Sequence, residues 1–153
     1  MNLLLLLAPF LITISDLKNV MLNASDFEEN IEIGNENYTK SYDVWALYNG
    51  IEVYQLPELE SKEFQSFRRG SDKGNVFYFL FSDNLNEGSE VLIEKIIWNN
   101  KTSRNNNRPA KYYIKDNILV VLYFNFKSAI GSNIENIVKN KIGSNSSLPS
   151  KTH

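Results

Sequence analysis

The sequence predicts an α+β fold in which an antiparallel sheet of about five or six strands carries one or two packed helices. Three observations support this prediction. Asn49-Gly50 lies between two runs rich in β-branched and aromatic residues, which is a strong hairpin signal because both residues tolerate the positive φ of a type I′ turn. The continuous apolar run at 76–81 is typical of a strand buried on both faces. The apolar residues between Ile134 and Ile142 recur at helical spacing.

The chain begins with a segment that has the pattern of a secretory leader. Residues 1–15 carry no charged side chain, and Leu3–Ile14 form an apolar run. This run has the length of a signal-peptide core and is shorter than the ~20 residues of a membrane span. Thr13 and Ser15 place small residues at positions −3 and −1 of a cut before Asp16. No Lys or Arg precedes the run, so an uncleaved membrane anchor and a buried first strand or helix stay open as alternatives.

The remaining chain has the size and composition of one globular domain. We expect a signal peptide at 1–15, a single α+β domain at 16–142 and a flexible tail at 143–153. Hydrophobic residues make up 42% of the sequence and aromatic residues 12%, which is typical of a packed core. The sequence contains no cysteine, so the domain must fold without disulfides, and a lipid-modified cysteine is excluded. The expected location is therefore periplasmic or secreted.

The first hairpin is expected to span residues 43–56, on either side of Asn49-Gly50. A two-residue turn at this position pairs Trp45 with Tyr54 across the two strands. This aromatic pair either supports a helix or stays exposed for binding.

The next stretches predict a helix and an ambiguous element. Pro57 is expected to begin a short helix that Gly70 ends, with Phe64 and Phe67 facing inward. The segment 91–98 fits a strand, although its apolar residues also fit a helix.

The C-terminal part predicts a second hairpin and a helix. Lys111–Lys115 and Ile118–Phe126 are expected to pair around the turn residues 116–117. The segment Ser132-Asn-Ile-Glu135 has the spacing of a capping box, in which the Ser and Glu side chains each satisfy a free backbone N–H. Gly143 is the expected end of this helix.

Charge is distributed unevenly along the chain. Residues 16–67 contain eleven acidic and three basic residues, whereas residues 68–153 contain thirteen basic and seven acidic ones. The net charges of −8 and +6 sum to the −2 of the whole chain. The two halves either neutralise each other in one folded domain or present a charged face to a partner.

The side-chain inventory excludes several kinds of site. His153 is the only histidine and there is no cysteine, so Ser-His-Asp and Cys-His catalysis, Cys/His zinc sites, haem and iron–sulfur ligation are excluded. The acid-rich stretches 58–63 and 87–94 are more typical of a solvated face than of a hydrolase pair. The oxygen-rich stretch 83–87 lacks the spacing of an EF-hand. We therefore expect no catalytic residue, no metal and no cofactor.

These observations favour an exported, non-enzymatic protein-binding domain, such as an inhibitor or an immunity protein against a secreted toxin. The basic segment 95–115 contains aromatic residues and suits an acidic protein surface. We expect no nucleic-acid binding, because the pI is near 5.5, and no membrane span after leader cleavage. The candidate partner-binding residues are Trp45, Tyr54, Trp98, Lys101, Arg104, Arg108, Lys111 and Tyr113.

Two other functions stay open. A small-ligand or glycan-binding protein would hold its ligand in a pocket between sheet and helix, lined by amphipathic rings. A carboxylate-dependent hydrolase would need two acidic side chains that converge in a cleft. The tyrosines available for a ligand pocket are Tyr42, Tyr48, Tyr54, Tyr78, Tyr112 and Tyr113.

Overall fold

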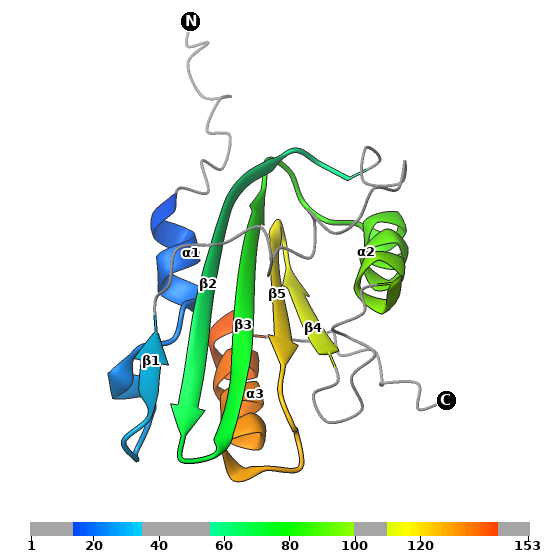
Figure 1. Ribbon diagram of the computed structural model, residues 1–153. Helices are drawn as coiled ribbons and strands as arrows, with labels where there is room; N and C mark the ends of the chain where they lie inside the picture. The colour runs from blue at the N-terminus through cyan, green and yellow to red at the C-terminus, as the bar shows by residue number, and fades with distance from the viewer. Residues whose placement is uncertain (1–13, 35–55, 100–109, 144–153) are drawn as a thin grey trace, which may run out of the picture.

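A computed structural model of the chain describes residues 14–34, 56–99 and 110–143, except for the side chains of residues 14–16, 95–96 and 98–99. Its five strands form one antiparallel sheet in the order β1-β2-β3-β5-β4 (Figure 1). The α+β class and the five-stranded antiparallel sheet are thus confirmed, with three helices in the described chain. The elements in chain order are α1 (Ile14–Val20), the short 3₁₀ helix η1 (Ala24–Asp26), β1 (Glu32–Gly34), β2 (Leu59–Arg69), β3 (Asp72–Phe81), α2 (Glu87–Asn99), β4 (Ala110–Lys115), β5 (Ile118–Tyr123) and α3 (Ala129–Ile142).

The sheet separates two hydrophobic clusters. Tyr78 and Val120 belong to the first cluster, which packs the sheet against α1 and α3. Phe79 belongs to the second cluster, which packs the opposite face against Ile93 and Ile97 of α2. Figure 1 shows α3 behind β3 and α2 on the other side of the sheet. Residues 76–81 are all buried, which confirms the expectation of a strand covered on both faces.

The predicted helix between Pro57 and Gly70 is wrong, because this segment forms the long strand β2. Phe64 packs in the α2 cluster, whereas Phe67 packs in the cluster of α1 and α3, so the two rings lie on opposite faces. The neighbouring strand β3 pairs with β2 from Arg69 back to Leu59 and satisfies the backbone groups that a helix would have satisfied internally. Gly70, with φ +61°, forms the turn between the two strands.

The other predicted elements that fall within the described chain are found, with shifted boundaries. Residues 91–98, for which the sequence fits either a strand or a helix, lie within the helix α2. The hairpin of β4 and β5 is confirmed, with Asp116 at φ 54° in its turn. The first hairpin, 43–56, lies outside the described residues except for Leu56.

The helix α3 begins one turn earlier than predicted. Ser128, rather than Ser132, is its N-cap and accepts a hydrogen bond from the backbone N–H of Gly131 at 3.1 Å. Gly143 ends the helix at φ 66°, as expected. Glu135 is therefore not a capping residue but lies in the second turn of the helix, facing the sheet.

The N-terminal helix crosses the position of the predicted cleavage. α1 begins at Ile14, and Leu17 and Val20 are buried against the sheet. Residues 1–13 lie outside the described chain, so the signal peptide stays a prediction. None of the helices in the described part is both long and apolar enough to cross a membrane.

Candidate functional site

Strands β1, β2 and β3 bring polar side chains into two rows on the α2 face of the sheet. The first row runs across the three strands from Glu32 through Arg68 to Lys73, because these residues are direct partners in the strand register. The second row runs from Gly34 through Ser66 to Asn75. Side chains two positions apart on a strand point to the same face. Both rows therefore share the face on which Phe64 and Phe77 form the α2 cluster.

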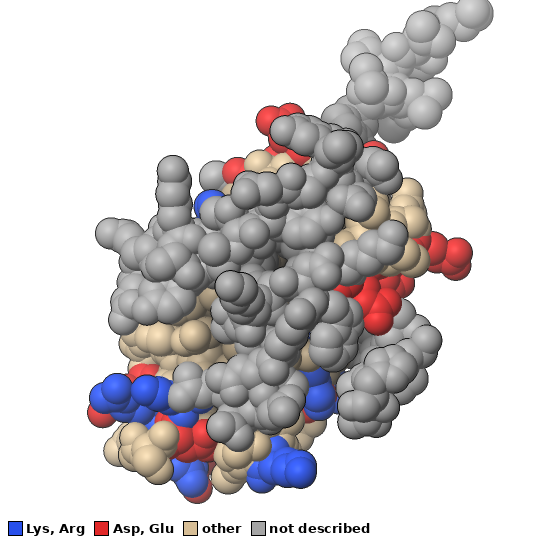
Figure 2. All heavy atoms as spheres, turned by 45° about the vertical axis from the view of Figure 1, so that its right-hand side comes forward, with Lys and Arg blue, Asp and Glu red and all other residues tan. Residues whose placement is uncertain are grey.

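These two rows line an open hollow of about 590 Å³ at the end of the sheet. This volume lies within the range of about 300–1,000 Å³ that is typical of binding clefts. Figure 2 shows basic and acidic side chains together at the lower end of the molecule, where β2 turns into β3 in Figure 1. The polar residues that line the hollow are Glu32, Ser66, Arg68, Lys73 and Asn75.

Two cations of the hollow, Arg68 and Lys73, lie directly opposite each other, and Glu32 faces Arg68 from β1. Arg68 and Lys73 are both exposed, and neither forms an ion pair with any residue that the structure describes. Like charges at directly opposite positions of a sheet repel each other. Other cations of the described chain do form ion pairs, such as Arg69 with Glu29, Lys111 and Lys139 with Glu135, and Lys141 with Asp26. Of the charged side chains that the structure describes in the hollow, two are basic and one, Glu32, is acidic, so the basic charge exceeds the acidic charge by one.

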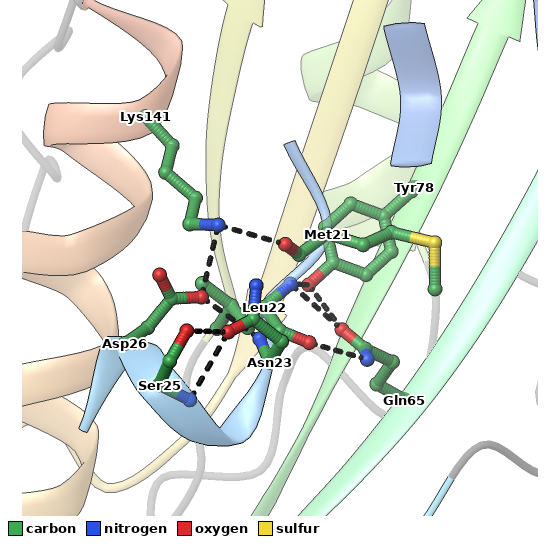
Figure 3. A network of polar contacts seen from close by, with 8 residues as sticks. All are labelled: Met21, Leu22, Asn23, Ser25, Asp26, Gln65, Tyr78 and Lys141. Atoms are coloured by element: carbon green, nitrogen blue, oxygen red, sulfur yellow. Dashed lines mark hydrogen bonds and ion pairs between the residues drawn. The ribbon is translucent and has the colours of Figure 1, made fainter. Parts of the chain in front are cut away.

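A buried polar clamp on the opposite face holds the chain that leads into β1 (Figure 3). Gln65 of β2 donates a hydrogen bond to the carbonyl of Leu22 at 2.8 Å and accepts one from the Leu22 N–H at 3.2 Å. The hydroxyl of Tyr78 donates to Gln65 Oε1 at 2.7 Å and accepts from the Leu22 N–H at 3.3 Å. Burial raises the pKa of Tyr78 well above its usual value, so this hydroxyl keeps its proton.

The clamp continues into η1 and α3. Lys141 donates to the carbonyl of Met21 at 3.0 Å and forms an ion pair with Asp26 at 2.9 Å (Figure 3). Asn23 and Asp26 form a capping box around η1. Because β1 begins six residues after Asp26, these contacts fix the start of the segment that carries one wall of the hollow.

Two buried tyrosines provide a matched test of the clamp. We expect Tyr78→Phe to lower the free energy of unfolding by about 1 kcal/mol, because the hydroxyl has partners on two residues. Tyr123→Phe is the control, since the Tyr123 hydroxyl is equally buried but has no hydrogen-bond partner in the described chain. The control is expected to be neutral or stabilising. Urea unfolding at pH 7 measures both, and equal losses would contradict the role of the clamp.

A second polar cluster lies beneath α3 and includes two of the residues predicted to bind a partner. Glu135 Oε2 lies 2.7 Å from Lys111 Nζ, and Glu135 Oε1 accepts a hydrogen bond from the Tyr113 hydroxyl at 2.5 Å. Lys139, one helical turn later, lies 3.0 Å from Oε1. Lys111 Nζ also lies 4.3 Å from the centre of the Phe126 ring. This geometry joins β4 to α3.

Opposing effects set the ionisation of Glu135. Burial disfavours its charged form, but hydrogen bonds from Lys111, Tyr113 and Lys139 outweigh this effect and place the pKa of the carboxyl below its usual value. Burial and the hydrogen bond to Glu135 raise the pKa of Tyr113. At neutral pH Glu135 is therefore a carboxylate and the Tyr113 hydroxyl keeps its proton.

The structure places only some of the predicted partner-binding residues. Trp98 lies in α2, but its side chain is outside the described part. Lys111 is partly buried and Tyr113 is 2% exposed, and both contact Glu135 rather than forming an open surface. Arg68 and Lys73 were not predicted as site residues, because they come together only through the pairing of β2 with β3, where a helix was expected at 57–70. The candidates outside the described residues are Trp45, Tyr54, Lys101, Arg104 and Arg108.

The acid-rich and oxygen-rich stretches form no metal centre in the described chain. No three His, Cys, Asp or Glu side chains gather closely enough there to hold an ion. Asn86 Oδ1 instead accepts a hydrogen bond from the Ser89 N–H at 2.9 Å, at the start of α2. Comparison with family models, curated proteins and solved structures finds no match to this chain.

Proposed function

We propose that this chain is a non-enzymatic protein-binding domain that contacts its partner through the hollow between β1, β2 and β3. The observation that carries this proposal is the exposed Arg68–Lys73 pair, which forms no ion pair with any described residue even though Glu32 lies opposite Arg68. A partner that brings negative charge to this hollow removes the repulsion between the two cations. Such charge complementarity speeds encounter and selects among partners.

The described core gives less support to the other two functions. Tyr78 and Tyr113 belong to the core and do not line the hollow, as a tyrosine-lined ligand pocket would require. Glu135, the one buried acid among the described residues, is held by two lysines rather than by a second carboxylate. The predicted leader at residues 1–15 favours a periplasmic or secreted location for the binding domain. An inhibitor or an immunity protein against a secreted toxin fits this class.

The proposal is tested by comparing partner capture by charge variants of the full chain. Immobilised protein is incubated with the envelope and secreted fractions of the source organism, and the captured protein is then purified and titrated by calorimetry. We expect Arg68→Glu/Lys73→Glu to weaken this purified complex at least tenfold, since two attractive contacts become repulsive. Lys18→Glu/Lys127→Glu is the control, because it makes the same change in net charge at two exposed sites outside the hollow.

The possible outcomes test separately whether the chain binds a protein and whether the hollow is its binding surface. Loss of the complex in the Arg68/Lys73 variant but not in the control supports the proposal. Equal affinity of both variants would place the interface elsewhere. If wild-type protein captures no partner from either fraction, protein binding is overturned as the function.

A further inference from the structure

We infer that the hollow recognises a short segment of the partner protein in which an acidic residue is followed, two positions later, by a basic one. This inference rests on the proposed function and adds the charge pattern of the partner. It follows from the first row of side chains, in which Lys73 and Arg68 are adjacent and Glu32 is at the β1 end. The row thus presents two positive charges and then one negative charge.

The two cations define the acidic position. Directly opposite residues of an antiparallel pair place their Cβ atoms about 5 Å apart, so one carboxylate can lie between Arg68 and Lys73. The guanidinium of Arg68 can donate two parallel hydrogen bonds to a carboxylate, and the ammonium of Lys73 supplies the second charge. Glu32 lies on the other side of Arg68, and no acidic residue of the described chain forms an ion pair with either cation.

Glu32 defines the basic position and the spacing. Neighbouring strands lie about 4.8 Å apart, so the midpoint between Arg68 and Lys73 lies about 7 Å from Glu32 along the row. Residues i and i+2 of an extended peptide are about 6.7 Å apart and point to the same side. An acidic side chain over the two cations therefore places the side chain two residues later over Glu32, where a Lys or Arg is favoured.

The second row is suited to the peptide backbone. Ser66 and Asn75 are direct cross-strand partners that line the hollow next to the charged row. Their hydroxyl and amide groups can both donate and accept hydrogen bonds, as an extended backbone requires. The absence of a side chain at Gly34 leaves space at the β1 end of this row.

The same arrangement disfavours nucleic acid. A continuous polyanion that contacts Arg68 and Lys73 also meets Glu32 in the same row. Strong binding of nucleic acid depends on many phosphate contacts, and this hollow offers two cations. A single carboxylate with a basic neighbour fits the row better.

Fluorescence anisotropy of labelled heptapeptides tests the inference on the full chain at about 20 mM salt, where charge pairs are least screened. The probe sequence Gly-Ser-Asp-Ser-Lys-Ser-Gly carries the acid–base pattern. Its neutral analogue has Asn and Gln at the two charged positions, and an acid–acid analogue has Asp at both. We expect the acid–base peptide to bind at least fivefold tighter than either analogue.

Variants of the hollow test which of its residues recognise the acidic position of the peptide and which recognise the basic position. Arg68→Glu/Lys73→Glu should abolish the preference for the acid–base peptide, and Lys18→Glu/Lys127→Glu should leave it unchanged. Glu32→Gln should remove the discrimination against the acid–acid peptide while the preference for the acid–base peptide over the neutral one remains. A labelled single-stranded oligonucleotide is included, and tighter binding of this probe than of the acid–base peptide would overturn the inference.

The proposed function and the inferred charge pattern can each fail while the other is supported. If Arg68→Glu/Lys73→Glu weakens the purified complex but wild-type protein binds the three peptides equally, the hollow binds a protein and the inferred charge pattern is wrong. If the acid–base peptide is preferred but no protein partner is captured, the charge pattern is supported and the proposed function is not.

Discussion

Glu135→Ala is expected to lower the free energy of unfolding by about 3 kcal/mol at pH 7, at the lower end of the loss typical for a broken buried ion pair. The substitution removes the acceptor for the Tyr113 hydroxyl and the counter-charge of Lys111, both beneath α3. Lys111 has a side-chain exposure of 28%, so water compensates for part of the loss. Urea unfolding followed by circular dichroism gives the free energy directly.

Two controls separate the buried cluster from general charge effects. Lys139→Met should cost less than about 1 kcal/mol, because its ion pair with Glu135 lies between residues one helical turn apart and the lysine is 37% exposed. Glu87→Ala removes an exposed acid from the first turn of α2 and should cost at most about 0.5 kcal/mol. A loss for Glu135→Ala no larger than that for Glu87→Ala would show that the cluster contributes little to stability.

The same carboxyl should give acid sensitivity in a defined direction. Because the pKa of Glu135 in the folded protein lies below its unfolded value of about 4.3, its ionisation stabilises the fold above that pH. This contribution is lost as the pH falls through the folded-state pKa. The stability difference between wild type and Glu135→Gln should therefore be constant from pH 6 to 8 and shrink below about pH 4.

The parts of the fold that sequence predicts well are those in which local pattern and tertiary packing agree. The run at 76–81 is apolar at every position, and only a strand covered on both faces buries all six. Gly143 ends α3 because its φ of 66° favours glycine, a purely local requirement. Local pattern misleads in residues 57–70, where Pro57 and Gly70 suit the ends of a helix but the pairing with β3 decides the structure.

The candidate site depends on that same pairing, which explains why the sequence does not reveal it. Arg68 and Lys73 are five residues apart in the sequence, and only the β2–β3 register places them opposite each other. Glu32 joins them from a strand more than thirty residues away. For Glu135, the capping-box spacing was a valid local signal, but Ser128 caps the helix one turn earlier and leaves Glu135 free to meet Lys111.

Gly131→Ala is expected to destabilise the protein by about 2–3 kcal/mol, as an overpacking substitution. A Cβ at this position would lie closer than 3.0 Å to the backbone carbonyl of Asn125. That carbonyl cannot withdraw easily, because it accepts hydrogen bonds from the Ser128 N–H at 2.9 Å and the Ser128 hydroxyl at 2.7 Å. The clash therefore strains the connection between β5 and the N-cap of α3. Thermal and urea unfolding measure the resulting loss in the free energy of unfolding.

Helix propensity alone predicts that Gly131→Ala changes the free energy of unfolding in the opposite direction. Alanine is favoured over glycine by about 1 kcal/mol inside a helix, so Gly131→Ala should stabilise α3 if the close contact is unimportant. Gly88→Ala in α2 is the matched control, since its Cβ would meet only the side-chain oxygen of Asn86 at 3.2 Å. We expect this control to be neutral or to gain up to about 1 kcal/mol. A gain at both glycines would contradict the tight packing of α3 against the end of β5, whereas a loss at Gly131 alone confirms that this contact outweighs helix propensity.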